Sequence, residues 1–453
     1  MSHEDQFGVA QMTGDSAAVR YFDTAVSKFL IFNNDPLAEV DKAIAIDPGF
    51  RMAQVLKGLL CLLGTEKAQL PVAKAALRAA KAQSQDASAR EKQHLGALEA
   101  WTLGRLKEAC AIWENILIEE PRDVLAMLAA HHTDFFLGNS IELRDRIARR
   151  LPSLDKGSRL AGYYQGMYAF GLEETGDYAR AEQIGCESVA ADSRNAWAIH
   201  AVAHVFEMTQ RIEDGQRWLT GKVDDWFPNN FFAVHLWWHL ALYTADHQHW
   251  DEVLGLYDSR IRATDSAIVL DMVDASSLLW RLLLQGIDVG NRWQRMAEVW
   301  EPRLDDGWYA FNDLHAMMAF AGAGRRDLVE RLLKAMHAAG AQTTDQSRID
   351  NGLMTRTIGL PVATALAAFV DGRYAETIDL LVSVKAIAVR AGGSHAQRDV
   401  IAQTLIVAAE KSGRTRLARA LLNERLELKP HSGINLAWQR RLDSAGRPDP
   451  ALQ

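Results

Sequence analysis

The sequence predicts an all-α fold built from a repeated helical hairpin. Only 11 prolines occur in 453 residues, and the chain forms successive amphipathic helical patterns separated by short Gly, Asp and Asn breaks. The breaks recur along the chain with similar residues around them. A composition of 48% hydrophobic and 24% charged residues is typical of a soluble protein that can bury a large core.

The breaks define the expected hairpins in chain order. In most of them a turn glycine precedes an aromatic or aliphatic residue, a small residue follows where two helices cross, and in some units a proline ends the second helix. These positions are Asp47 and Pro48; Gly104, Leu106, Ala109 and Pro121; Gly176, Tyr178 and Ala181; Gly372 and Tyr374; and Gly413, Ala418 and Pro430. This pattern resembles the tetratricopeptide repeat.

The resemblance implies a tetratricopeptide-like solenoid, in which stacked hairpins form a right-handed superhelix and the first helix of each hairpin lines a concave groove. We expect an N-terminal segment at 1–34, the repeat array at 35–430 and a C-terminal tail at 431–453. The concave site is expected at about 131–315, with 392–399 as a cap.

Charge and composition exclude several classes of partner. The net charge of −8 and the pI of 6.0 provide no basic surface for nucleic acid. The N-terminal MSHEDQFGVA has no basic segment followed by an apolar one, and no apolar run approaches the roughly 18 residues that span a bilayer. We therefore expect a cytoplasmic protein without a membrane partner. The sequence leaves open whether the chain forms a homo-oligomer. The three cysteines suggest buried thiols.

Two histidine pairs are the most informative feature. His200 and His204, and His235 and His239, are each four residues apart, and the second pair follows the first by 35 residues. Residues at i and i+4 share a helix face, so adjacent repeat helices would bring four imidazoles to one wall of the groove. Glu207 extends the first pair by one turn.

Further polar and aromatic side chains fall on groove-facing positions if the tetratricopeptide register is kept. Asp271 and Asp274 follow the second histidine pair by one repeat, and Arg281 lies two turns later. The remaining candidates are His132, Tyr163, Trp197, Asp313 and His315.

Five segments carry a resemblance to a known family: YYQGMYAFGLEETGDYARAE from Tyr163, WAIHAVAHVFEM from Trp197, HLWWHLALY from His235, LDMVDASSLLWRL from Leu270, and GGSHAQRDV from Gly392. In these segments the chain is similar to bacterial members of the tetratricopeptide repeat protein 38 family. The resemblance implies the repeat architecture, and it implies no particular reaction.

One interpretation of the histidines is a divalent metal site, for zinc or a similar ion, formed by His200, His204, His235 and His239. The i, i+4 spacing suits two imidazoles on one ion. The first pair reads HAVAH and not HExxH, so Ala201 stands where a metalloprotease keeps its general base. Glu207 or an aspartate would have to take that role.

A second interpretation needs no metal, because a carboxylate beside an imidazole forms an acid and base pair. His204 with Glu207 and His239 with Asp274 are the expected pairs, and Asp313 with His315 is weaker because residues two apart on a helix do not face each other. Such a site could hydrolyse an amide, ester or lactam, or isomerise a small molecule. The predicted catalytic residues are His200, His204, Glu207, His235, His239 and Asp274.

The alternative is a scaffold that binds a peptide or protein partner without catalysis, which is the common role of helical repeats. Arg281, Trp197 and either Trp237 or Trp238 would then be contact residues. Peptide-binding repeats usually line the groove with Lys, Asn and Arg, whereas this groove offers His, Asp and Glu. That lining favours a polar small molecule or a cation.

The segment Gly392–Asp399 contains the pattern of a capping box, in which Ser394 and Gln397 cap a helix. His395 and Arg398 would then project from a helix N-terminus, where an anion is attracted. The predicted substrate-binding residues are accordingly His132, Tyr163, Trp197, Asp271, Arg281, His315 and Arg398.

Overall fold

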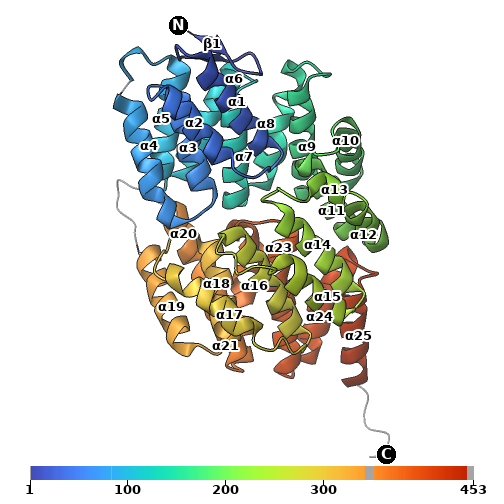
Figure 1. Ribbon diagram of the computed structural model, residues 1–453. Coiled ribbons are helices and arrows are strands. Elements are labelled where there is room, and N and C mark those ends of the chain that lie inside the picture. Colours follow the sequence, from blue (N-terminus) through green and yellow to red (C-terminus); the bar gives the residue numbers. More distant parts are fainter. Residues whose placement is uncertain (1, 83, 342–349, 446–453) are drawn as a thin grey trace, which may run out of the picture. The chain divides into compact units, whose positions relative to one another are not determined.

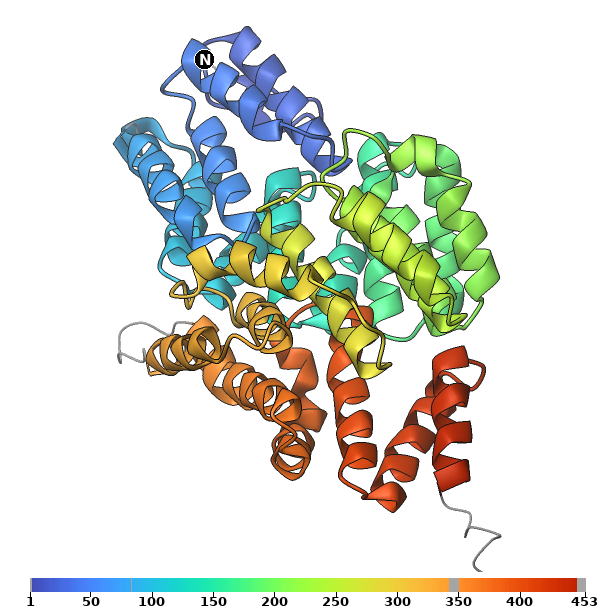
Figure 2. The same ribbon diagram turned by 60° about the horizontal axis from the view of Figure 1, so that its bottom comes forward.

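The computed structural model describes residues 2–82, 84–341 and 350–445 (Figures 1 and 2). The described residues are mostly helical, and β1 and β2 form one short antiparallel pair near the N-terminus. Consecutive helices pack against each other as hairpins, for example α1 on α2 and α23 on α24. The predicted fold class, all-α and tetratricopeptide-like, is confirmed.

Contacts divide the chain into two compact units. Unit 1 comprises the described parts of Met1–Val202, Lys222–Ala233 and Gly340–Leu353, and unit 2 those of Ala203–Gly221, Val234–Ala339 and Met354–Gln453. The division falls inside the continuous helix α11.

Unit 1 contains the N-terminal hairpins. Its elements are β1 (His3–Glu4), β2 (Ala10–Gln11), α1 (Ser16–Leu30), α2 (Pro36–Ile46), α3 (Arg51–Leu63), η1 (Lys67–Gln69), α4 (Leu70–Ala82), η2 (Ser84–Asp86), α5 (Ala89–Thr102), α6 (Leu106–Glu119), α7 (Val124–Leu137), α8 (Ser140–Ala148), η3 (Leu151–Ser153), α9 (Arg159–Glu174), α10 (Tyr178–Ala191), the first half of α11 (Ala196–Met208), α13 (Val223–Trp226) and most of α20 (Asp350–Met354).

Unit 2 contains the C-terminal hairpins. Its elements are the second half of α11, α12 (Ile212–Thr220), α14 (Ala233–Asp246), α15 (Trp250–Leu256), η4 (Tyr257–Ile261), α16 (Val269–Leu284), α17 (Arg292–Trp300), η5 (Glu301–Arg303), α18 (Ala310–Gly322), α19 (Arg326–Gly340), η6 (Thr355–Gly359), α21 (Leu360–Val370), α22 (Tyr374–Val384), η7 (Lys385–Ala391), α23 (His395–Lys411), α24 (Thr415–Leu428) and α25 (Gly433–Ala445).

The residues predicted to form the hairpin turns and crossings do so. The four turn glycines adopt left-handed backbone, which a residue without Cβ tolerates. Their φ angles are 74° at Gly104, 84° at Gly176, 74° at Gly372 and 75° at Gly413. The small crossing residues Ala109, Ala181 and Ala418 are completely buried. Local sequence thus determines where each hairpin bends and where its two helices touch.

Side-chain caps set several helix starts. The Ser88 hydroxyl accepts from the Glu91 N–H, and the Glu91 carboxylate accepts from the Ser88 N–H, so α5 begins with a capping box. The predicted box at the start of α23 is also present, with Ser394 and Gln397 in the same reciprocal arrangement. The capping interpretation of this segment is confirmed, and it fixes the entry into a helix that packs on α16.

One helical run differs from the sequence expectation. The 21 residues Asp350–Val370 are long and apolar enough to cross a membrane by length and composition alone. Their most apolar window is 61% buried within the protein, which is the behaviour of a core helix.

The cysteines Cys61 and Cys110 are buried free thiols, as expected, whereas the third cysteine, Cys186, is partly exposed.

Candidate functional site

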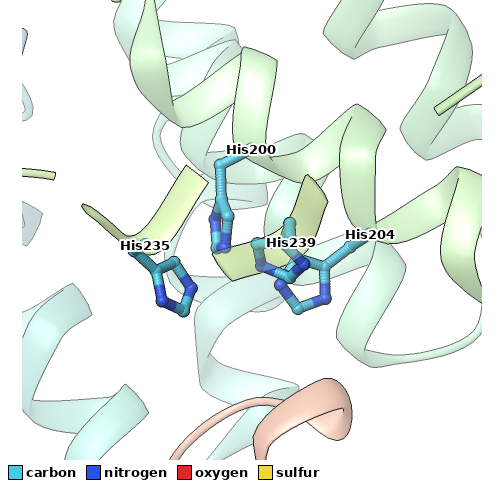
Figure 3. A group of neighbouring side chains, drawn as sticks. All are labelled: His200, His204, His235 and His239. Carbon is cyan, nitrogen blue, oxygen red and sulfur yellow. The ribbon is translucent and has the colours of Figure 1, made fainter. Parts of the chain in front are cut away.

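Helices α11 and α14 place histidine rings against one another. Within unit 2, the rings of His204 and His239 have centroids 4.5 Å apart, and those of His235 and His239 are 4.8 Å apart. His200 lies one turn before His204 on the same helix. His204, His235 and His239 each offer one ring nitrogen, and these nitrogens lie within 4.8 Å of one another (Figure 3). None of the four histidines is more than 6% exposed. We call His204, His235 and His239 the histidine cluster.

A carboxylate orients His235. Its Nδ1 lies 3.0 Å and 2.9 Å from the two carboxylate oxygens of Asp274, which is completely buried on α16. The carboxylate accepts from Nδ1–H and so selects the tautomer whose Nε2 carries a lone pair. Trp238 stacks on the His235 ring, with centroids 5.3 Å apart and planes at 15°. The ring is thereby held in both position and tautomer.

A second carboxylate lies beside His239. The Nδ1 of His239 is 3.6 Å from Glu207 Oε2, while Glu207 Oε1 accepts from Lys429 Nζ at 3.0 Å. Burial alone would raise the pKa of Glu207, but the Lys429 charge and His239 lower it to about 2. Burial lowers the pKa of the His239 imidazole. A neutral imidazole therefore faces an ionised carboxylate near neutral pH.

The direct hydrogen bond of Asp274 differs from the expected pairing. Sequence register placed Asp274 beside His239, 35 residues earlier, whereas it bonds His235, 39 residues earlier. The difference of four residues is one helical turn. Helices α14 and α16 are thus offset by about one turn from the simple repeat register.

The cluster has the donor set of a zinc-like site. Imidazole nitrogen is a preferred zinc ligand at about 2.0–2.1 Å, and a carboxylate on the far ring nitrogen is the usual second layer of such sites. Asp274 provides that layer for His235 through a hydrogen bond, whereas Glu207 lies at ion-pair distance, 3.6 Å, from Nδ1 of His239. The same groups can also serve as an acid and base pair.

Unit 2 has a small cavity of about 60 Å³ next to this site. Glu207 belongs both to the cavity wall and to the contacts of His239. The other charged or amide side chains on the wall are Gln210, Asp246, Arg281, Gln285, Asp399, Gln403, Arg425 and Lys429. Several of these were absent from the sequence interpretation. No local sequence pattern links Lys429 to Glu207, its partner 222 residues earlier.

Three further candidates in unit 2 have structural partners of their own. The Asp271 carboxylate accepts from Ser266 Oγ at 2.6 Å. His315 Nδ1 lies 2.7 Å from the Phe311 carbonyl oxygen, to which it can donate, and burial lowers the pKa of His315 to about 4. Arg398 donates to the carbonyl oxygen of Gly393, next to the helix cap. Of the predicted anion contacts, Arg281 lies on the cavity wall and Arg398 does not.

The three candidates in unit 1 pack against aromatic or polar neighbours. His132 stacks on Phe29 of α1, with centroids 5.5 Å apart, and its ring also meets Trp197 edge-on at 5.1 Å. The Trp197 indole donates to the carbonyl oxygen of Leu30 at 3.1 Å. The N-terminal helix thus covers both side chains.

Tyr163 is held separately in unit 1. Its hydroxyl accepts from Arg159 and donates to Asp192 at 3.2 Å. These contacts satisfy the hydrogen-bonding capacity of the buried Tyr163 hydroxyl, so its position needs no ligand to explain it.

Asp271 provides a test of electrostatics near the site. Burial raises the pKa of its carboxyl to about 6 from an ordinary 3.8, so the folded protein binds more protons than the unfolded chain between these values. Stability contributed by the protonated form is lost as pH rises through 6. We expect Asp271→Asn to stabilise the protein by about 1–3 kcal/mol at pH 7.5 and to leave it unchanged at pH 3.5. Urea unfolding at both pH values measures this.

The control is Asp379→Asn, because the Asp379 side chain is 75% exposed and should have no such effect. An Asp271→Asn protein that is no more stable than wild type at pH 7.5 would contradict a destabilising charge at Asp271.

The chain was compared with family models and with solved structures. No family model matches the chain. Among solved structures, the chain is similar to a human IFIT1 dimer with PPP-AAAA (13% identity, TM-score 0.37, 96% of this chain and 92% of that chain). It is also similar to yeast Tom70 (11% identity, TM-score 0.31, 97% and 92%).

Proposed function

We propose that this protein, a helical-repeat protein of the tetratricopeptide repeat protein 38 type, binds a divalent transition-metal ion such as Zn²⁺ at the histidine cluster. His204, His235 and His239 would be the three protein ligands, which would leave the fourth position of a tetrahedral ion open for water or substrate. The supporting observation is the combination of buried imidazoles on α11 and α14 with a carboxylate at Nδ1 of two of them.

Burial and charge both suit a metal. Burial lowers the pKa of the His239 imidazole, and neutral imidazole is the form that ligates. The charge of a divalent ion would be balanced by Asp274 and Glu207, of which Glu207 also contacts Lys429. Histidine and carboxylate without cysteine thiolate favour zinc or a neighbouring first-row ion.

We further propose that the site binds a polar small molecule and hydrolyses it. A bound ion would supply a Lewis acid and a water of lowered pKa. Glu207 lies on the cavity wall beside His239, so its carboxylate can accept a hydrogen bond from that water or from substrate and orient it. Amide, ester and lactam bonds are the substrate class that this chemistry serves.

The test is a metal analysis of full-length protein purified without chelator, followed by Zn²⁺ titration of the metal-free protein against a chromophoric chelator. We expect about one ion per chain for wild type. His239→Ala should lose more affinity than the roughly 10–100-fold typical of an outer-layer substitution. The matched control is His249→Ala, because that histidine side chain is 63% exposed and should bind no structural ion.

Two results would overturn the metal proposal: a wild-type protein that takes up no stoichiometric ion, or a His239→Ala protein that binds Zn²⁺ as tightly as wild type. Either would favour the alternative, a scaffold that holds a peptide or protein partner without catalysis.

A further inference from the structure

Arg281 is a buried cation whose hydrogen bonds all go to uncharged acceptors. It lies on α16, is 6% exposed and forms part of the cavity wall. Its guanidinium donates to the carbonyl oxygen and hydroxyl of Ser277, at 3.0 Å and 2.6 Å, and to the carbonyl oxygen of Ala396 at 2.5 Å. It also lies over the Trp238 ring, 5.2 Å from the centroid. Within the described ranges no carboxylate lies at ion-pair distance from Arg281.

The other two cations on the wall have carboxylate partners. Lys429 Nζ lies 3.0 Å from Glu207, and the Arg425 guanidinium donates to Asp399 at 3.0 Å. The remaining wall carboxylate, Asp246, accepts from Ser432 Oγ at 2.5 Å and from the Gly433 N–H at 3.1 Å. Burying a guanidinium without a counterion is costly, and an anionic ligand would remove that cost.

Amide groups around Arg281 add donors and an acceptor. The buried Nε2 atoms of Gln210 and Gln285 and the buried Oε1 of Gln403 have no hydrogen-bond partner, and all three residues line the cavity. Buried polar atoms are normally satisfied, so their gathering in one cavity indicates a polar occupant. The positive charge of the Arg281 guanidinium and the amide N–H groups suit an anion, and the amide oxygen suits a ligand hydroxyl or amide.

We propose that this cavity binds the carboxylate group of a small polar substrate, with Arg281 as the anion contact. The role of this ligand as a substrate rests on the proposed function, because Glu207 both lines the cavity and contacts His239 of the histidine cluster. A carboxylate fits better than a phosphate, since the nearby carboxylates Glu207 and Asp399 would repel a doubly charged group.

The size of the cavity limits the ligand. A water needs roughly 10–15 Å³ on the same measure, so about 60 Å³ holds a handful of waters or a few heavy atoms. A hydroxy acid or an amino acid derivative matches this volume and the amide lining. A peptide is too large to be enclosed there.

The experiment is isothermal titration of the full-length protein with acetate, glycolate, lactate and inorganic phosphate, each with and without added Zn²⁺. At least one carboxylate should bind wild type, and Arg281→Gln should weaken that binding roughly 10- to 100-fold. Arg281→Lys retains the charge without the planar fork and should be intermediate. The control is Arg260→Gln, because Arg260 lies over Trp237 and not on the cavity wall.

The outcomes separate this inference from the metal proposal. If His239→Ala protein no longer binds Zn²⁺ but still binds a carboxylate, that result supports the Arg281 site. The metal proposal is tested separately, by the zinc titration. Equal carboxylate affinity in folded Arg281→Gln and wild type would overturn the inference. Binding of phosphate but of none of the carboxylates would overturn it as well.

Discussion

The Asp274→Ala variant is expected to bind Zn²⁺ roughly 10- to 100-fold more weakly than wild type. Asp274 accepts from Nδ1 of His235 through both carboxylate oxygens and is completely buried. Without it, the His235 ring loses the group that selects its tautomer, and a bound ion loses a nearby negative charge. Chelator competition at fixed pH measures the change in dissociation constant.

Asp271→Ala is the matched control for this effect. Asp271 lies on the same helix, three residues before Asp274, and is also buried, but its hydrogen bond goes to Ser266. Its loss should leave zinc affinity within about threefold of wild type, because no ligand depends on it. Unchanged zinc binding by folded Asp274→Ala would show that the carboxylate does not support a metal ligand.

The Lys429→Met variant is expected to lose about 3–5 kcal/mol of unfolding free energy at pH 7.5. The substitution keeps the buried aliphatic stem but removes the ammonium group, 3.0 Å from Glu207. The Glu207 carboxylate then stays buried without its main counter-charge. Urea or thermal unfolding of metal-free protein gives the difference.

Glu207 sets the pH dependence of that loss. The folded-state pKa of Glu207 is lowered to about 2 from 4.5, so the stability from this charge is present above 4.5 and is lost as pH falls toward 2. In Lys429→Met the carboxyl can take up a proton, and the destabilisation should shrink as pH falls below about 4.5.

Two comparisons make the Lys429 result specific. The double variant Glu207→Gln with Lys429→Met should recover most of the stability, because no unpaired charge remains. Lys385→Met should lower the unfolding free energy by less than about 1 kcal/mol, because the Lys385–Glu424 pair is exposed. The Lys385 side chain is 45% exposed and the Glu424 side chain 56%. Equal losses for Lys385→Met and Lys429→Met would contradict a buried charge pair.

Local pattern predicted the hairpins well, since a turn glycine, a small crossing residue and a capping box act over a few residues. It predicted less about which surfaces are covered. Trp197 and His132 fall on groove positions of the repeat, yet helix α1 packs over them. The pattern of one helix does not specify whether a distant segment will lie on it.

The sequence by itself determined the helices and the meeting of His204, His235 and His239, because helical periodicity and repeat length are properties of nearby residues. Only the tertiary structure decided that Asp274 bonds His235, and that Lys429 reaches Glu207 across 222 residues. The first pairing depends on the offset between the packed helices α14 and α16, and the second on where the C-terminal part of the chain packs against α11. Close packing of whole side-chain surfaces sets these, and no short stretch of sequence encodes them.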